Sequence, residues 1–157
     1  MAADRELAEG DSAPDFVLPS SNGDNVKLSS LKGKNVVLYF YPEDDTSGRT
    51  KEACSFRDNL PKFNNLDATI LGISKDSLES HKSFIKKYGH NFTLLSDEEL
   101  KVNNLYGTWQ EKNMYGKKYW GTVRSTFVID KAGKIKKIFR KVRVEDHEKA
   151  VLEALAS

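Results

Sequence analysis

The stretch NVVLYFY at residues 35–41 constrains the fold more than any other part of the chain. Six apolar or aromatic side chains follow one another from residue 36 without polar alternation. A strand of this kind has both faces buried, so it lies in the interior of a sheet that other layers cover. The sequence therefore predicts an α/β architecture with this strand at its centre.

Helical and strand patterns alternate after this strand. Residues 50–64 carry apolar side chains at helical spacing, and ATILGIS at 68–74 is a second apolar strand, which together predict a βαβ unit. Residues 77–88 resemble a helix that begins with Ser77 as its N-cap. A short strand is expected at 92–95.

Ser96 to Glu99 has the spacing of a capping box, which predicts a third helix running through Tyr106. Two hairpins and a terminal helix complete the pattern. The expected segments are strands 15–18 and 25–28 around Asn22-Gly23, strands 125–130 and 134–139 around 131–133, and an amphipathic helix at 145–155.

This order of elements predicts one domain over residues 1–157 with a thioredoxin-like fold. Its mixed central sheet should be flanked by helices and preceded by an N-terminal β-hairpin extension. Ligands of open α/β sheets bind beyond the carboxyl ends of the parallel strands, where residues 41–50 lie. Function is therefore expected in that segment.

Charge and hydropathy exclude several classes of partner. The chain has 25 Lys and Arg against 23 Asp and Glu, a net charge of +2 without a concentrated basic face, so we expect no nucleic acid partner. The seven basic residues within 131–143 are interpreted as an edge strand with solvated flanks. The longest apolar run is too short to cross a bilayer, and the acidic N-terminus does not resemble a signal peptide, so we expect no membrane partner and an intracellular protein.

Cys54 is the single cysteine, which excludes an intrachain disulfide and a zinc site made of several thiolates. His81, His90 and His147 lack ligand spacing and are interpreted as surface residues, so no metal is expected.

Four aromatic residues lie close together late in the chain: Trp109, Tyr115, Tyr119 and Trp120. They fit either an aromatic recognition surface or simple loop packing, and the sequence leaves both interpretations open.

Five segments carry a resemblance to a known family. They are GDSAPDF, LSSLKGKNVVLYFYPEDDTSGRTKEACSFRD, LLSD, YGTWQEK and GTVRSTFVID. The chain resembles the peroxiredoxins, and within them the peroxiredoxin Q group, also called bacterioferritin comigratory proteins.

The resemblance implies a set of catalytic positions. Family members have a peroxidatic cysteine, whose thiolate attacks peroxide, where this chain has Arg49. Pro42 would shield the reacting group, Thr46 would hydrogen-bond the peroxide, and Arg124 would lower the thiol pKa and hold the peroxide oxygens. Cys54 occupies the resolving position of the group. Without the family, Thr46 is better explained as a helix cap, and Arg124 as an exposed ion-pair partner.

The resemblance also implies the substrates and partners. These are hydrogen peroxide and organic hydroperoxides as substrates, and thioredoxin or a similar dithiol as reductant. No metal or organic cofactor is implied, since the electrons pass through sulfur. A cytoplasmic monomer is expected.

Arg49 cannot act as a nucleophile, because its guanidinium stays protonated at any accessible pH. We favour an engineered or incidental substitution that inactivates a peroxidase. The alternatives are a natural, catalytically dead binding or regulatory protein, and a protein in which Cys54 has become the nucleophile.

Overall fold

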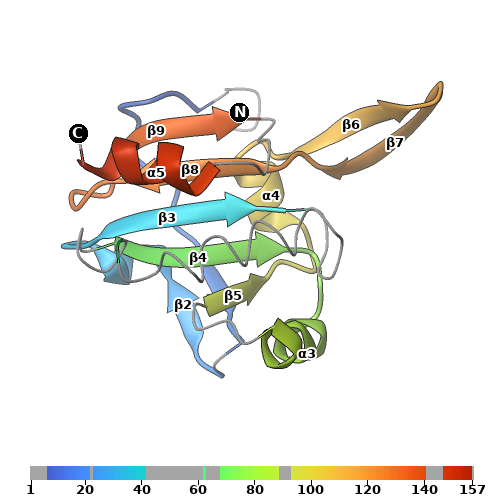
Figure 1. Ribbon diagram of the computed structural model, residues 1–157. Helices are drawn as coiled ribbons and strands as arrows, with labels where there is room; N and C mark the ends of the chain where they lie inside the picture. The colour runs from blue at the N-terminus through green and yellow to red at the C-terminus, as the bar shows by residue number, and fades with distance from the viewer. Residues whose placement is uncertain are drawn as a thin grey trace.

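The computed structural model describes residues 7–21, 23–41, 62, 68–88, 93–140 and 147–156. Its main sheet has five strands in the order β5-β4-β3-β8-β9 (Figure 1). Their bounds are β3 Asn35–Phe40, β4 Ala68–Ser74, β5 Thr93–Ser96, β8 Ser125–Ile129 and β9 Ile135–Arg140. The predicted mixed sheet is confirmed: β3, β4 and β5 are parallel, whereas β8 and β9 run antiparallel to their neighbours.

Strand β3 lies at the centre of this sheet, as its apolar run predicts. Residues 36–40 are each at most 2% exposed, because the strand has neighbours on both edges and covering layers on both faces. Val37 belongs to the core on one face and Leu38 to the core on the other. The alternating side chains of one strand thus contribute to two separate cores.

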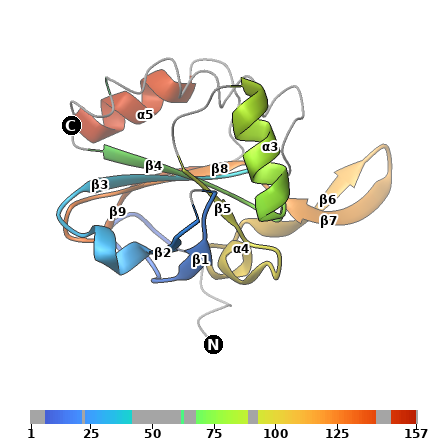
Figure 2. The ribbon, with the colours of Figure 1, turned by 90° about the horizontal axis from the view of Figure 1, so that it is seen from below.

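Two layers enclose the sheet (Figure 2). Helices α3, Leu78–Tyr88, and α5, His147–Ala156, cover one face, where Ile85 and Val151 pack against the sheet. Ser77 accepts a hydrogen bond from the Ser80 amide through its hydroxyl, which confirms the predicted N-cap. The predicted helix at 50–64 lies outside the described residues apart from Lys62, which is helical.

The other face is covered by the predicted N-terminal hairpin and by short helices. The hairpin consists of β1, Val17–Pro19, and β2, Asn25–Lys27, and is followed by the 3-10 helix η2, Leu28–Leu31. Gly23 in the turn has φ 94°, a left-handed conformation that glycine adopts without strain.

The predicted capping box at Ser96 is wrong. Ser96 ends β5 and donates its hydroxyl to the Asp76 carbonyl, and helix α4 begins later, at Lys101–Leu105. The buried carboxylate of Asp97 accepts the amides of Val102 and Asn103 and the Asn103 side-chain amide at 2.8–3.2 Å. Asp97, rather than Ser96, therefore caps the start of helix α4.

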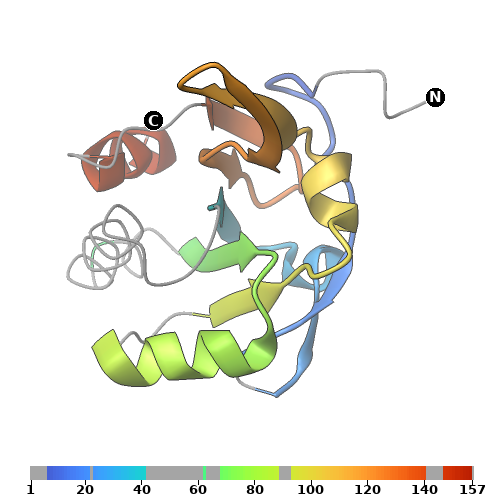
Figure 3. The same ribbon diagram turned by 90° about the vertical axis from the view of Figure 1, so that its right-hand side faces the viewer.

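A two-stranded arm projects from the body of the molecule (Figures 1 and 3). It consists of β6, Trp109–Met114, and β7, Lys117–Thr122, paired antiparallel. Tyr115 and Gly116 form its turn with φ of 54° and 80°, which is typical of a two-residue hairpin turn with both central residues left-handed. No strand was predicted for residues 109–122.

The segment before β1 lies along the outer edge of β9, which is an edge strand of the sheet as predicted. The Gly10 amide donates to the Ile135 carbonyl, and the Ile135 amide donates to the Asp11 carbonyl. The Ile138 amide donates to the Glu9 carboxylate at 3.1 Å. Part of the edge is therefore paired rather than open to another chain.

No helix in the described ranges is both long enough and apolar enough to cross a membrane.

Candidate functional site

The carboxyl ends of β3, β4 and β5 meet at one edge of the sheet, which is the edge where the sequence predicts the site. Tyr41, the last described residue after β3, donates its amide to the Ile73 carbonyl. The parallel pairing therefore continues up to residue 42, the first of the predicted site residues in the sequence. The predicted site residues Pro42, Thr46, Arg49 and Cys54 lie outside the described residues.

Arg124 is the predicted site residue that the structure describes. It directly precedes β8, whose first residue, Ser125, is the register partner of Phe40 in β3. Arg124 comes directly before Ser125 and Tyr41 directly after Phe40, so both residues flank the last pair of this antiparallel ladder. Arg124 is partly buried rather than fully solvated. The fold thus brings residue 124 beside the start of the motif from more than eighty positions away in the chain.

Tyr41 is held by a buried histidine. Its hydroxyl lies 3.5 Å from His81 Nδ1, and His81 Nε2 lies 3.0 Å from the Leu95 carbonyl oxygen. The carbonyl only accepts, so His81 Nε2 carries a proton and donates it in this contact. His81 is completely buried, so its interpretation as a surface residue was wrong. This pair links the end of β3 to α3 and β5.

A second polar cluster connects the ends of β4 and β5. The Ser74 hydroxyl donates to the Asp76 carboxylate at 2.7 Å, and the Asp97 amide donates to the Ser74 carbonyl at 2.8 Å. Lys75 lies between Ser74 and Asp76 in the sequence. Its Nζ is 6.0 Å from the centre of the Trp109 ring, at the root of the arm. The arm is therefore rooted at the same edge as Arg124.

Arg140 is a further cation at this edge that the sequence analysis did not identify. It ends β9 as the register partner of Ser125, and its guanidinium carbon lies 5.4 Å from the centre of the Phe127 ring. One arginine at the end of a strand that is already basic has no sequence pattern that marks it as a site residue. Its position at this edge follows from the pairing of β8 with β9. Arg124 and Arg140 thus come from neighbouring chain segments at this edge, one before the first residue of β8 and the other at the end of β9.

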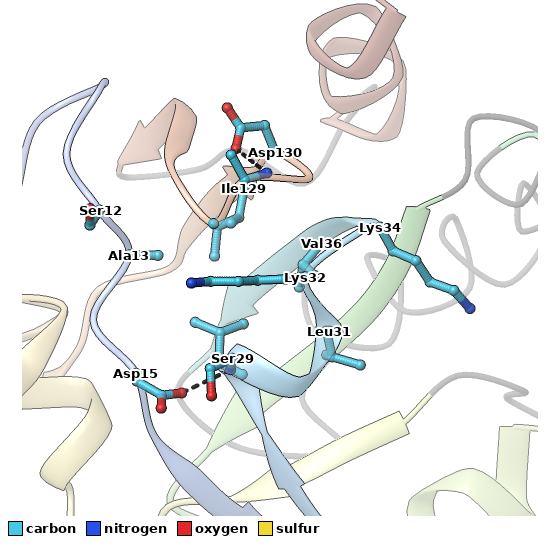
Figure 4. Close-up of a pocket in the computed structure, with 13 residues that line it drawn as sticks. Ser12, Ala13, Asp15, Ser29, Leu31, Lys32, Lys34, Val36, Ile129 and Asp130 are labelled. Atoms are coloured by element: carbon cyan, nitrogen blue, oxygen red, sulfur yellow. Dashed lines mark hydrogen bonds between the residues drawn. The ribbon is translucent and has the colours of Figure 1, made fainter.

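A separate cavity of about 120 Å³ lies at the opposite edge, beside the start of β3 (Figure 4). Lys32 extends across it, and the Asp15 carboxylate accepts the Ser29 amide at 2.9 Å. Hydrogen bonds from the amides of Ser29 and Phe16 outweigh partial desolvation and lower the Asp15 pKa. Because the cavity is at the amino end of the parallel strands, it is not the site that the motif predicts.

The chain matches the AhpC/TSA family over residues 9–138. It is 49% identical to peroxiredoxin Bcp of Bacillus subtilis, with 93% of each chain covered. Against peroxiredoxin Bcp of Escherichia coli the identity is 42%, with 95% and 96% covered.

Solved structures agree with this match. A bacterioferritin comigratory protein of Xanthomonas campestris is 41% identical with a TM-score of 0.86 and 90% of each chain covered. A mutant of PrxQ from Xylella fastidiosa is 35% identical with a TM-score of 0.91 and 97% of each chain covered. These likenesses confirm the thioredoxin-like fold. The chain belongs to the AhpC/TSA family, and its relatives there are peroxiredoxins of the Bcp and PrxQ type.

Proposed function

We propose that this chain has the scaffold of a thiol-dependent peroxidase of hydrogen peroxide and organic hydroperoxides, and that Arg49 leaves it without turnover. Thioredoxin or a similar dithiol would be the electron donor, and the cytoplasm its place of action. The Xanthomonas relative, whose structures concern alkyl peroxide reduction, supports the substrate class. The observation that supports the proposal is the pairing of β3 with β8, in which Ser125, the neighbour of Arg124, is the partner of Phe40 at the end of β3.

The chemistry of the parent reaction explains why residue 49 decides the outcome. A thiolate at that position attacks one peroxide oxygen, the O–O bond breaks, and water or an alcohol leaves while the sulfur becomes a sulfenic acid. The Cys54 thiol then condenses with the sulfenic acid, which releases water and forms a disulfide. An external dithiol reduces this disulfide by exchange. A guanidinium offers no electron pair for the first step.

The test is the substitution Arg49→Cys. We expect this variant to consume peroxide in the presence of thioredoxin and its reductase, whereas the Arg49 protein does not. Arg124→Ala in the variant should then lower kcat/KM for peroxide about a hundredfold, since a placed charge stabilises the transition state. A revertant that is folded and still no faster than the Arg49 protein would contradict the proposal.

The second candidate is a catalytically dead protein that binds a ligand at the same edge. Arg49 itself favours this function, because it would add a cation close to Arg124. Such a protein would keep its ligand affinity in the Arg49 form and lose it in Arg49→Cys, so binding and turnover in the same two proteins distinguish the candidates.

A further inference from the structure

A buried asparagine lies where helix α4 meets both strands of the arm (Figure 3). Asn103, Thr108 and Thr122 are each at most 1% exposed. Asn103 Oδ1 accepts the hydroxyls of Thr108 and Thr122, each at 2.9 Å. Thr108 directly precedes β6 and Thr122 ends β7, so one side-chain oxygen joins both ends of the arm to α4. The Thr108 hydroxyl also lies 3.1 Å from the Asn103 carbonyl oxygen, whereas the Thr122 hydroxyl contacts Oδ1.

The same asparagine is anchored at the ends of two parallel strands. Asn103 Nδ2 donates to the buried carboxylate of Asp97 at 2.8 Å. Asp97 directly follows β5, and its amide donates to the carbonyl of Ser74, the last residue of β4, at 2.8 Å. A buried polar network whose groups are paired makes the elements that it connects rigid. This network therefore fixes the ends of the arm relative to the carboxyl edge of the main sheet.

Arg124 belongs to the segment that this network holds, because it comes two residues after Thr122. The Val123 amide donates to the Thr108 carbonyl at 2.7 Å. The Ser125 hydroxyl donates to the Val123 carbonyl at 2.9 Å, and Ser125 begins strand β8 of the main sheet. The backbone is thus fixed on both sides of Arg124, by the network before it and by the sheet after it.

We propose that Asn103 is a positioning residue for Arg124 and that it acts through the hydroxyl of Thr122. The inference rests on the proposed function, in which Arg124 favours a thiolate at position 49 and holds the peroxide oxygens. A charge of this kind stabilises a transition state best when it is already in place before the reaction begins. A misplacement of about 1 Å can cost about a hundredfold in rate. Asn103 is buried, so it contributes by placing the segment that carries Arg124.

Thr122 offers a matched pair of substitutions. Thr122→Val has nearly the same shape but no hydroxyl, so it removes the contact between Asn103 Oδ1 and the end of β7. Thr122→Ser keeps the hydroxyl. The control is Tyr106→Phe, because Tyr106 directly follows α4 and donates its hydroxyl to the Pro14 carbonyl at 2.6 Å. It removes a hydrogen bond next to the same helix that does not involve the arm.

Peroxide kinetics of the Arg49→Cys protein give the first test. In that protein Thr122→Val should lower kcat/KM for peroxide about tenfold, since Arg124 is no longer held in place. It should also raise the apparent pKa of the pH–rate profile, because a displaced guanidinium favours the thiolate less. Thr122→Ser and Tyr106→Phe should leave both quantities unchanged. A profile that does not move, or a serine variant as impaired as the valine variant, would overturn the proposal.

Nuclear magnetic resonance of the Arg49 chain gives a second test that needs no turnover. The Nε–Hε signal of Arg124 can be identified by its loss in Arg124→Lys, and nitrogen relaxation of this signal reports how well ordered the side chain is. The order should fall in Thr122→Val and persist in Thr122→Ser and Tyr106→Phe. Asn103→Ala removes the acceptor of the same hydrogen bond and should reproduce the effect of Thr122→Val. Equal order in all of these chains would refute the positioning role.

The two tests keep the inference apart from the proposed function. If Arg49→Cys has no turnover, the proposed peroxidase is wrong, and the order of Arg124 alone decides the inference. Thermal unfolding of each variant separates a loss of stability from a loss of position. Thr122→Val and Tyr106→Phe each remove one hydrogen bond, so reduced stability alone predicts the same effect for both. Equal effects of these two variants on Arg124 and on the pH–rate profile would therefore count against the proposal.

Discussion

Gly72→Ala should destabilise the fold, because the centre of β4 has no room for a methyl group. A Cβ at residue 72 would lie 2.6 Å from Cζ and the hydroxyl oxygen of Tyr39 and 2.7 Å from Cδ2 of Leu94. Contacts below 3.0 Å essentially do not occur for real Cβ atoms. Gly72 is the register partner of Tyr39, so the tyrosine ring fills the space that a side chain would occupy.

Neither neighbour can withdraw easily. Tyr39 and Leu94 are completely buried, and the Tyr39 ring stacks on Tyr41 with 5.5 Å between ring centres. Overpacking of a core costs about 1–3 kcal/mol. The reduced entropy of the unfolded chain returns about 0.4–1 kcal/mol for a Gly→Ala change. The difference leaves a net loss of about 0–2.6 kcal/mol in the free energy of unfolding. At the midpoints it is about 1.3 kcal/mol, which lowers the Tm by about 3–5 °C.

Urea unfolding followed by circular dichroism measures this loss, and a double-mutant cycle identifies its cause. Tyr39→Leu removes the ring atoms that the new methyl group would meet. The double variant should therefore be more stable than the sum of the single effects predicts, by about 0.5 kcal/mol or more. Additive effects, or a Gly72→Ala protein as stable as the parent chain, would refute the steric argument.

Other predictions concern charged groups. Asp97→Ala should lower the free energy of unfolding by about 2–4 kcal/mol, because it leaves buried donors of Asn103 and of the α4 backbone without an acceptor. Chemical denaturation measures this loss, and a loss below about 0.5 kcal/mol would contradict the prediction. Because the folded pKa of Asp15 is lowered, its stabilisation is present at neutral pH and is lost as pH falls through that pKa. Asp15→Asn should flatten the acid limb of the stability–pH curve, and an unchanged limb would count against this. Sulfate at constant ionic strength should raise Tm if Arg49 and Arg124 form an anion site, and Arg124→Ala should abolish the effect.

The main sheet could be predicted because its strands carry strong local patterns. ATILGIS at 68–74 coincides with β4, and the strand predicted at 92–95 is β5 displaced by one residue. The capping box failed because Ser96 has a tertiary partner, the Asp76 carbonyl, which local spacing does not reveal. The arm was missed because its turn places Tyr115 at positive φ, a conformation that bulky residues seldom adopt.

The candidate site likewise combines residues that the sequence predicts with residues that only the tertiary structure reveals. Arg124 was predicted from the family resemblance, and the β3–β8 ladder puts its neighbour Ser125 opposite Phe40, the residue before Tyr41. The contact of His81 with Tyr41 spans forty residues and depends on α3 lying over the end of β3. A lone histidine in a helix gives no signal of that partner, so only the tertiary structure reveals that it is buried.

Segments that are synthesised early pair with segments that are synthesised late, which affects folding on the ribosome. Strand β3 pairs with β4 soon after both are made, but its other edge waits for β8, whose Ile129 is the partner of Val36. The edge of β9 in turn receives the segment around Gly10, which is synthesised more than a hundred residues before β9. A nascent chain that lacks its last third therefore exposes an apolar strand edge and an unattached N-terminal segment. We expect such truncated chains to need a chaperone, and native structure to form only after synthesis has passed β9.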